Sequence, residues 1–170
     1  SGKYVWHRGD CFDLLDTIPD NSVQLILTSP PYAVGKDYER GSGIAETLTL
    51  QNKVIEECIR ILKPNGSICW QIANTYERAF NSKGLEISEQ IPWDILLYKH
   101  FVNNGLKLRN RIIWHYEHGT HAVHKFSNRY ETLLWFTKTD DYTFNLDSIR
   151  VPQKYPNKKA YKGANKGKLS

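Results

Sequence analysis

Residues 28–32, with the sequence Thr-Ser-Pro-Pro-Tyr, combine hydrogen-bond acceptors with an aromatic ring in a single turn. They directly follow an apolar run at residues 23–27, which predicts a buried strand, and they lead into a loop that contains Gly35. Proline fixes φ and has no N–H, so the turn is rigid and presents a backbone carbonyl beside the Ser29 hydroxyl, which is a second acceptor. Tyr32 adds an aromatic face on which a planar ring can stack. The alternative is a proline-rich turn without chemistry.

The turn resembles motif IV of the DNA amino-methyltransferases, which methylate the exocyclic nitrogen of cytosine or adenine. The resemblance implies that S-adenosylmethionine is the methyl donor and that Ser29, Pro30, Pro31 and Tyr32 are the catalytic residues. Ser29 and the Pro30 carbonyl would hold the amine hydrogens, and Tyr32 would stack on a base flipped out of the duplex. Transfer would be direct, because methylation of cytosine carbon-5 needs a cysteine after a proline and no cysteine here follows one.

Serine in the first catalytic position resembles the cytosine-N4 enzymes, whereas the adenine-N6 enzymes usually carry aspartate there. We therefore favour N4 of cytosine as the target, with N6 of adenine as the alternative. The resemblance implies a site-specific enzyme of DNA methylation, of the kind found in restriction-modification. Two alternative functions from other classes are an RNA methyltransferase and a DNA-binding module without catalysis.

Gly9 and Asp10, which precede a predicted helix, resemble the element whose carboxylate binds the adenine of S-adenosylmethionine. We assign Asp10, Cys11 and Thr28 to the cofactor site, with a simple helix cap as the alternative for Asp10. The cofactor motif of the family, Asp-Pro-Phe-x-Gly-x-Gly, has no match in the chain. In the circularly permuted subgroup this motif comes after the catalytic one, so the chain resembles the front portion of a longer enzyme.

The chain alternates strand and helix signals, which predicts an α/β fold. Strands are expected at residues 4–8, 23–28, 67–73, 109–116 and 131–137, the last two as an antiparallel hairpin. Helices are expected at residues 11–17, from a cap at Thr47 or Thr49 to residue 62, and from Pro92 to residue 105, with a polar connection at 74–90. The resemblance, supported by weaker matches at residues 62–70 and 129–138, implies a Rossmann-like methyltransferase sheet with helices on both faces. This sheet would be incomplete, so the remainder, a complementary chain or a dimer partner is expected to cover the open edge of the strand at 23–28.

Histidines recur every third residue in the loop before the last strand, at His115, His118, His121 and His124. This spacing does not match the usual zinc patterns and no cysteine accompanies it, so no metal is expected. We interpret the loop as facing double-stranded DNA, through Lys125, Asn128 and Arg129. A plain connecting loop is the alternative.

Positive charge is concentrated at the end of the chain. Seven of the 23 basic residues and none of the 18 acidic ones lie in residues 150–170, which leaves residues 1–149 with a net charge of −2. We divide the chain into a catalytic part at 3–149 and a basic tail that begins a DNA-recognition or connecting segment, with Lys154, Lys158 and Lys159 as DNA contacts. The alternative is a flexible tail surrounded by solvent.

The remaining composition favours a cytoplasmic protein, and the resemblance implies association with a bacterial or archaeal nucleoid. The 3 cysteines have no framework spacing and are interpreted as reduced thiols. No apolar stretch approaches the ~20 residues of a membrane span, so no membrane partner is expected.

Overall fold

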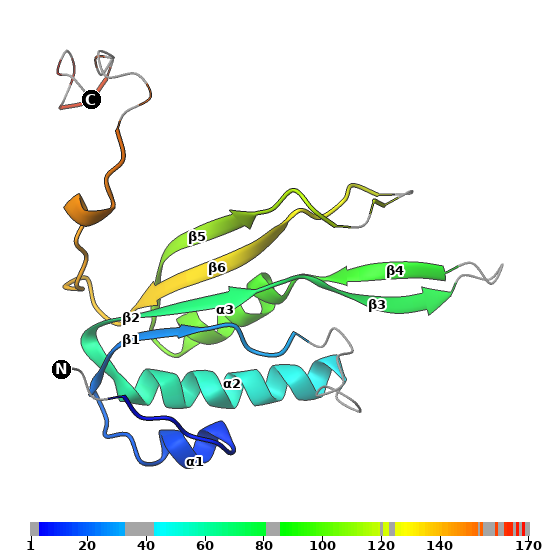
Figure 1. Ribbon diagram of the computed structural model, residues 1–170, viewed down its shortest axis with the longest axis horizontal. Coiled ribbons are helices and arrows are strands. Elements are labelled where there is room, and N and C mark those ends of the chain that lie inside the picture. The colour runs from blue at the N-terminus through cyan, green and yellow to red at the C-terminus, as the bar shows by residue number, and fades with distance from the viewer. Residues whose placement is uncertain are drawn as a thin grey trace.

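Figure 1 shows the computed structural model of the chain. The structure describes residues 4–32, 43–80, 86–119, 121–122 and 125–152, together with residues 154, 159, 162–164, 166 and 168. Gly35 therefore lies outside the described residues. Among the described helices, none has the length and apolar character that crossing a membrane requires.

A mixed four-stranded sheet organises the fold, with the strand order β1-β2-β6-β5. Strand β1 (Val23–Thr28) pairs parallel with β2 (Leu62–Ile72), and β2 pairs antiparallel with β6 (Tyr130–Thr137). Strand β5 (Lys107–His115) pairs antiparallel with β6 and completes the sheet. The α/β class and the antiparallel terminal hairpin predicted from the sequence are confirmed.

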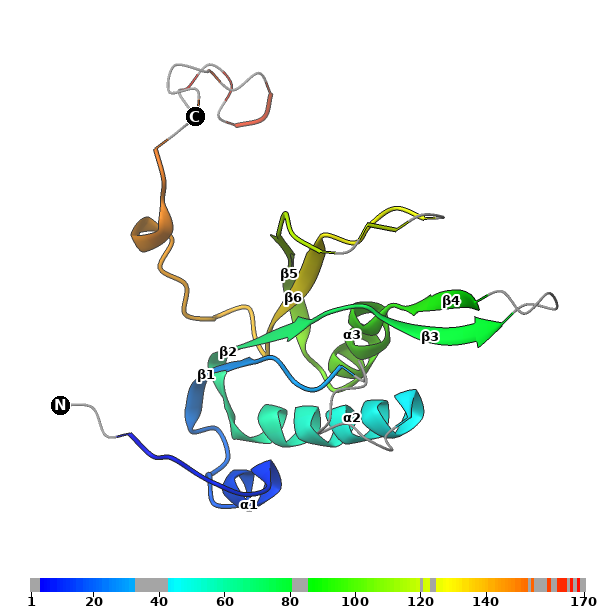
Figure 2. The ribbon, with the colours of Figure 1, turned by 45° about the vertical axis from the view of Figure 1, so that its right-hand side comes forward.

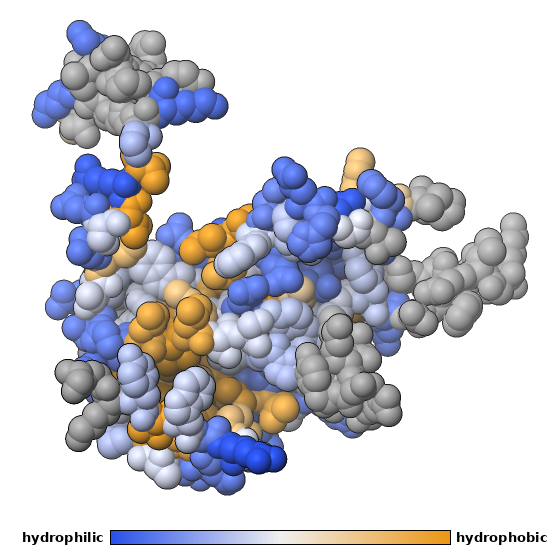
Figure 3. All heavy atoms as spheres, viewed as in Figure 1, coloured by the Kyte–Doolittle hydropathy of each residue, from blue (hydrophilic) through white to orange (hydrophobic). Residues whose placement is uncertain are grey.

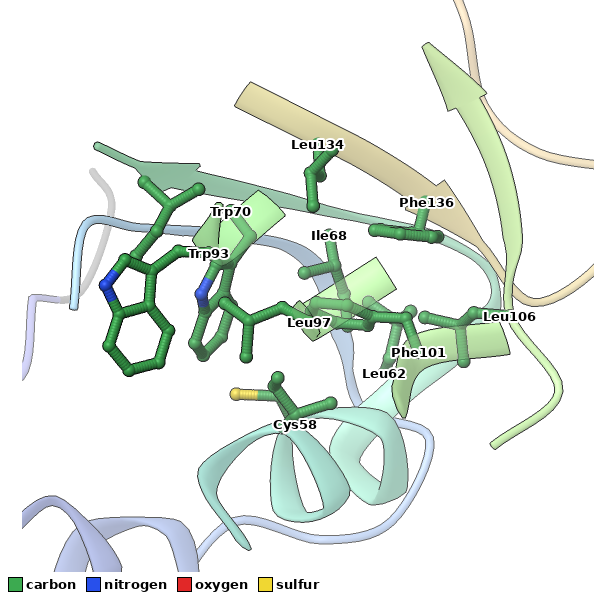
Figure 4. Packing of buried hydrophobic residues seen from close by; sticks show 12 residues of the cluster. Cys58, Leu62, Ile68, Trp70, Trp93, Leu97, Phe101, Leu106, Leu134 and Phe136 are labelled. Atoms are coloured by element: carbon green, nitrogen blue, oxygen red, sulfur yellow. The ribbon is translucent and has the colours of Figure 1, made fainter. Parts of the chain in front are cut away.

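Two helices, α2 (Ile44–Ile61) and α3 (Trp93–Asn103), pack on the sheet and enclose the core (Figure 4). The largest side chains of this core are fully buried and come from strands and helices alike. The ring of Phe101 in α3 stacks on Phe136 of β6 with centroids 4.3 Å apart and meets Trp70 of β2 edge-on at 5.6 Å. Burial of each such side chain contributes about 1.5–3 kcal/mol, so these rings fix α3 to the sheet.

The second face of the sheet is largely uncovered in the described residues. Side chains alternate along a strand, so Leu25 and Leu27 of β1 point away from the core, and they are 57% and 69% exposed. Figure 3 shows the resulting apolar patch over β1. Trp135 of β6 is partly covered by Phe144, with ring centroids 5.2 Å apart. The expectation of helices on both faces is therefore not met in the described part of the chain, because α2 and α3 share one face.

The N-terminal segment confirms a predicted helix but not a predicted strand. Helix α1 (Cys11–Leu15) follows Asp10, whose carboxylate accepts a hydrogen bond from the Phe12 backbone N–H at 3.0 Å. Residues 4–8 form no strand, and Trp6 is 93% exposed. A strand needs a paired neighbour for its backbone groups, and no described segment pairs with residues 4–8.

Helix α2 begins earlier than the sequence predicts. Its first residue is Ile44, because the Glu46 carboxylate accepts a hydrogen bond from the Gly43 N–H at 2.8 Å and closes the first turn. The predicted caps Thr47 and Thr49 lie inside the helix instead. Strand β2 likewise starts at Leu62, five residues before the predicted position at residue 67.

A second sheet occupies the region predicted to be a polar connection. Strands β3 (Thr75–Phe80) and β4 (Glu86–Ile91) form an antiparallel hairpin that projects from the end of β2 (Figure 1). The prediction failed here because backbone pairing rather than an apolar face defines the hairpin. After β6, a short 3-10 helix η2 (Asp147–Ile149) lies on a segment that leads away from the sheet (Figure 2).

Candidate active site

Residues 29–32 form the candidate catalytic loop. This loop begins where β1 ends, at the edge of the sheet that contains the carboxyl ends of the parallel strands. The hydroxyl groups of Ser29 and Tyr32 are hydrogen-bonded to each other. Tyr32 is half-buried against the core, whereas Ser29 is exposed. The structure therefore brings the predicted acceptor and the predicted stacking ring together, with the ring edge held at the serine hydroxyl.

A buried glutamine fastens this loop to the rest of the fold. Gln51 of α2 is 2% exposed. Its side-chain amide donates to the Pro31 carbonyl at 2.8 Å, and its side-chain carbonyl accepts from the Trp70 indole N–H at 3.2 Å. Gln51 was not predicted from the sequence, although a polar residue on the apolar stripe of α2, one turn before Ile55, is the signal that identifies it.

The two proline carbonyls of the loop differ in their surroundings. The Pro31 carbonyl is engaged by Gln51. No described residue donates a hydrogen bond to the Pro30 carbonyl. Among the described residues, the loop thus uses the Pro31 carbonyl to hold its shape, and the Pro30 carbonyl has no such contact.

The residues assigned to a cofactor site come from two places in the chain, the start of α1 and the tip of β1. Asp10 is exposed and caps α1, which agrees with the alternative interpretation of this residue as a helix cap. Burial, with the neighbouring Asp10 carboxylate, raises the pKa of the Cys11 thiol. Thr28 is half-buried at the tip of β1, next to the catalytic loop. The cofactor role of all three residues stays a prediction.

Two of the residues predicted to face DNA gather on Tyr76 of β3. Asn128 donates to the Tyr76 hydroxyl at 2.8 Å, and the Lys125 ammonium lies 3.6 Å from the centroid of the Tyr76 ring. Burial is the main cause that raises the pKa of the Tyr76 hydroxyl, and the nearby Tyr130 and Tyr116 raise it further. These residues line a cavity of about 400 Å³ between β3 and the loop that joins β5 to β6. Tyr76 was missed because the hairpin that carries it was not predicted.

The remaining predicted DNA contacts lie elsewhere. Arg129 donates to the Glu117 carbonyl at 2.9 Å and so braces the same loop. Lys154 and Lys159 belong to the tail that leads away from the sheet and are exposed, whereas Lys158 lies outside the described residues.

The histidine spacing produces no metal centre in the described part of the chain. There, no group of three histidine, cysteine, aspartate or glutamate side chains is placed to hold a metal ion. His115, His118 and His121 are exposed, and His124 lies outside the described residues.

A mixed sheet that carries an acceptor-rich aromatic turn at the carboxyl end of a parallel strand defines a methyltransferase-like α/β protein. Comparison with known protein families identifies its family. The sequence model of the DNA methylase family (N6_N4_Mtase) matches residues 23–170. The chain belongs to this family, which confirms the resemblance to the amino-methyltransferases.

Individual relatives agree with this assignment. The chain is 50% identical over 164 residues to the type II methyltransferase M.BglII of Bacillus subtilis, covering 96% of this chain and 43% of the relative. Among solved structures, the PvuII DNA methyltransferase (cytosine-N4-specific) matches with a TM-score of 0.65 and 22% identity, covering 83% of this chain and 51% of that one. TTHA0409 of Thermus thermophilus, a putative DNA modification methylase complexed with S-adenosyl-L-methionine, matches with a TM-score of 0.58 and 24% identity, covering 87% and 56%. The chain thus spans about half the length of these relatives.

Proposed function

We propose that the chain is the catalytic portion of a site-specific DNA methyltransferase that transfers a methyl group from S-adenosylmethionine to an exocyclic amino group, N4 of cytosine being favoured. The observation that carries the proposal is the loop of Ser29, Pro30, Pro31 and Tyr32, held at the tip of β1 by the buried Gln51. Membership of the DNA methylase family supports it.

The loop has the groups that an exocyclic amine requires. The nitrogen of such an amine is a poor nucleophile while its lone pair is conjugated with the ring. The Ser29 hydroxyl and the Pro30 carbonyl accept its two hydrogens and draw the nitrogen toward a tetrahedral geometry, which frees the lone pair. Tyr32 stacks on the flipped base and fixes its orientation. Because these groups are preorganised, they supply positioning and electrostatic stabilisation without a covalent intermediate.

S-adenosylmethionine supplies, when bound, an electrophilic methyl group on sulfur. The described residues fit only part of such a cofactor: Asp10 offers an exposed carboxylate, which suits the adenine amine, and Thr28 lies beside the catalytic loop. We therefore propose that Asp10, Cys11 and Thr28 form one wall of the cofactor site and that further residues complete it.

The open side of the sheet supports the proposal that a further segment completes the domain. Strand β1 pairs with β2 alone among the described strands, and Leu25 and Leu27 beside that edge are exposed. An apolar strand with a free edge invites pairing. We propose that the remaining half of a methyltransferase domain covers this edge and the adjoining face. A clean monomer of this polypeptide in analytical ultracentrifugation, with the β1 edge protected from hydrogen exchange, would contradict the need for a covering segment.

Transfer of label from isotopically labelled S-adenosylmethionine to duplex DNA tests the proposed function. Label in DNA, from the chain alone or after addition of a matching C-terminal half, is the expected result. A preference for RNA would favour the RNA methyltransferase. Absence of label in both arrangements, with DNA binding retained, would favour a binding module without catalysis.

The serine position tests the choice of base. Ser29→Asp replaces a hydroxyl by a stronger acceptor, so we expect a changed rate or a shift toward adenine. An unchanged rate and base choice would show that this position does not decide the target.

A further inference from the structure

One large apolar side chain stands out in the loop that joins β5 to β6. Phe126 is 96% exposed, more than any other large apolar residue among those described. It follows Lys125, which lies on the Tyr76 ring, and it lines the mouth of the cavity beside that ring. A phenylalanine in this position gains little from the protein core, and its ring can contact another molecule.

The loop that carries Phe126 is anchored on both sides. The Tyr116 backbone N–H donates to the Arg129 carbonyl at 2.9 Å and closes the loop at its base. Asn128, two residues after the phenylalanine, donates to the Tyr76 hydroxyl at 2.8 Å and ties the loop to β3. The phenyl ring is therefore presented from a braced segment, which lowers the entropy lost when it is inserted into a partner.

The loop lies at the same edge of the sheet as the candidate catalytic loop. Thr28 pairs with Trp70 across β1 and β2, and Trp70 pairs with Leu134 across β2 and β6. Neighbouring strands are about 4.8 Å apart, so Leu134 of β6 lies about 10 Å across the sheet from Thr28, and the loop after Thr28 and the loop before Tyr130 both leave the sheet at this edge. A DNA major groove is ~12 Å wide, so two loops that leave the same edge of one sheet can contact one duplex site.

We propose that Phe126 is a wedge that enters the DNA base stack at the place that the target base leaves. The inference rests on the proposed function, because a wedge has a use only if a base is flipped. Extraction of a base removes stacking from its neighbours, and an apolar side chain inserted between base steps replaces part of it. Lys125, whose ammonium lies over the Tyr76 ring, supplies positive charge that attracts the DNA backbone.

A rescue experiment separates this role from a structural one. Phe126→Ala is made in the form of the protein that methylates DNA, and kcat/KM is measured on a duplex that the wild-type protein methylates, first fully matched and then with an abasic residue opposite the methylated base. Because the unpaired target flips without help, we expect Phe126→Ala to lose at least about tenfold on the matched duplex and to recover most of that loss on the abasic one.

Trp6→Ala is the matched control. Trp6 is also an aromatic residue that is almost fully exposed, at 93%, but it lies outside the loop. We expect this variant to retain wild-type kcat/KM on both duplexes. Phe126→Leu keeps an apolar wedge and should retain most activity on the matched duplex.

Each other outcome overturns the inference in a recognisable way. Wild-type activity of Phe126→Ala on the matched duplex would show that no wedge is needed. An equal loss on both duplexes would show that Phe126 instead contacts another segment of the protein or a part of the DNA unrelated to flipping. A wild-type protein that methylates no duplex overturns the proposed function itself, and the wedge with it.

Discussion

Replacing Gln51 with leucine tests whether a buried amide holds the candidate catalytic loop. The side chain is 2% exposed and makes two hydrogen bonds, to the Pro31 carbonyl at 2.8 Å and from the Trp70 indole at 3.2 Å. Leucine is of similar size and apolar, so the change removes both bonds while it leaves little empty space. Stability and catalysis should both respond, for different reasons.

The loss of stability follows from the two former partners of Gln51. Trp70 is fully buried, so its indole N–H is left without an acceptor, which costs about 1–3 kcal/mol. Pro31 is exposed, so its carbonyl can bond to water and contributes little. We expect the free energy of unfolding to fall by about 2 kcal/mol, or Tm by about 4–8 °C for a chain of this size. We expect kcat to fall at least about tenfold, because the acceptors beside Tyr32 are no longer preorganised.

A double-mutant cycle with Trp70→Phe assigns the loss of stability to the indole. Phenylalanine has no N–H to leave unpaired, so Gln51→Leu should cost about 1–2 kcal/mol less in the Trp70→Phe background. Denaturant unfolding of the four proteins measures this coupling. If the losses of unfolding free energy of the two single variants add to that of the double variant within about 0.5 kcal/mol, and kcat of Gln51→Leu is unchanged, Gln51 does not hold the loop through Trp70 and Pro31.

Three further predictions concern the catalytic ring, the sheet and a buried thiol. Tyr32→Ala should lower kcat while the protein stays folded, with an unfolding midpoint lowered only by the loss of a half-buried ring; wild-type turnover would contradict the stacking role. Gly66→Ala should destabilise the chain by about 1–3 kcal/mol in denaturant unfolding, because a Cβ there would lie 2.9 Å from the Gln24 carbonyl and 2.8 Å from Leu62 Cδ1; an unchanged midpoint would contradict this close approach of β1 and β2. Burial raises the pKa of the Cys58 thiol from 9.0 to about 12, so the folded state keeps a proton that the unfolded chain loses. The free energy of unfolding should therefore fall as pH rises through this range, and should fall less in Cys58→Ala; equal slopes for the two proteins would contradict it.

The elements that the sequence predicted well are those whose own segments are rich in apolar residues. Strand β1, helix α3 and the β5–β6 hairpin were found because such runs are bounded by turn residues, and the turn at residues 29–32 was found because two prolines and a tyrosine follow β1. Such runs are local, so a single sequence displays them.

The elements that were missed depend on partners that lie far away in the chain. The β3–β4 hairpin is held by backbone pairing between polar segments, and residues 4–8 are not a strand because no described segment pairs with them. The role of Gln51 needs the positions of Pro31 and Trp70, and that of Tyr76 needs Lys125 and Asn128. Such tertiary contacts are set by the fold, so the pattern of any one segment does not display them.

Identification of the methylated atom tests the central claim most directly. Duplex DNA treated with the active methyltransferase is digested, and the nucleosides are separated and identified by mass spectrometry against authentic standards. The Ser29–Tyr32 hydrogen bond and the anchoring of Pro31 by Gln51 support the proposal of a methyl group on an exocyclic nitrogen, with N4-methylcytosine as the expected product. N6-methyladenine would keep the mechanism and overturn the choice of base, whereas 5-methylcytosine would contradict the account.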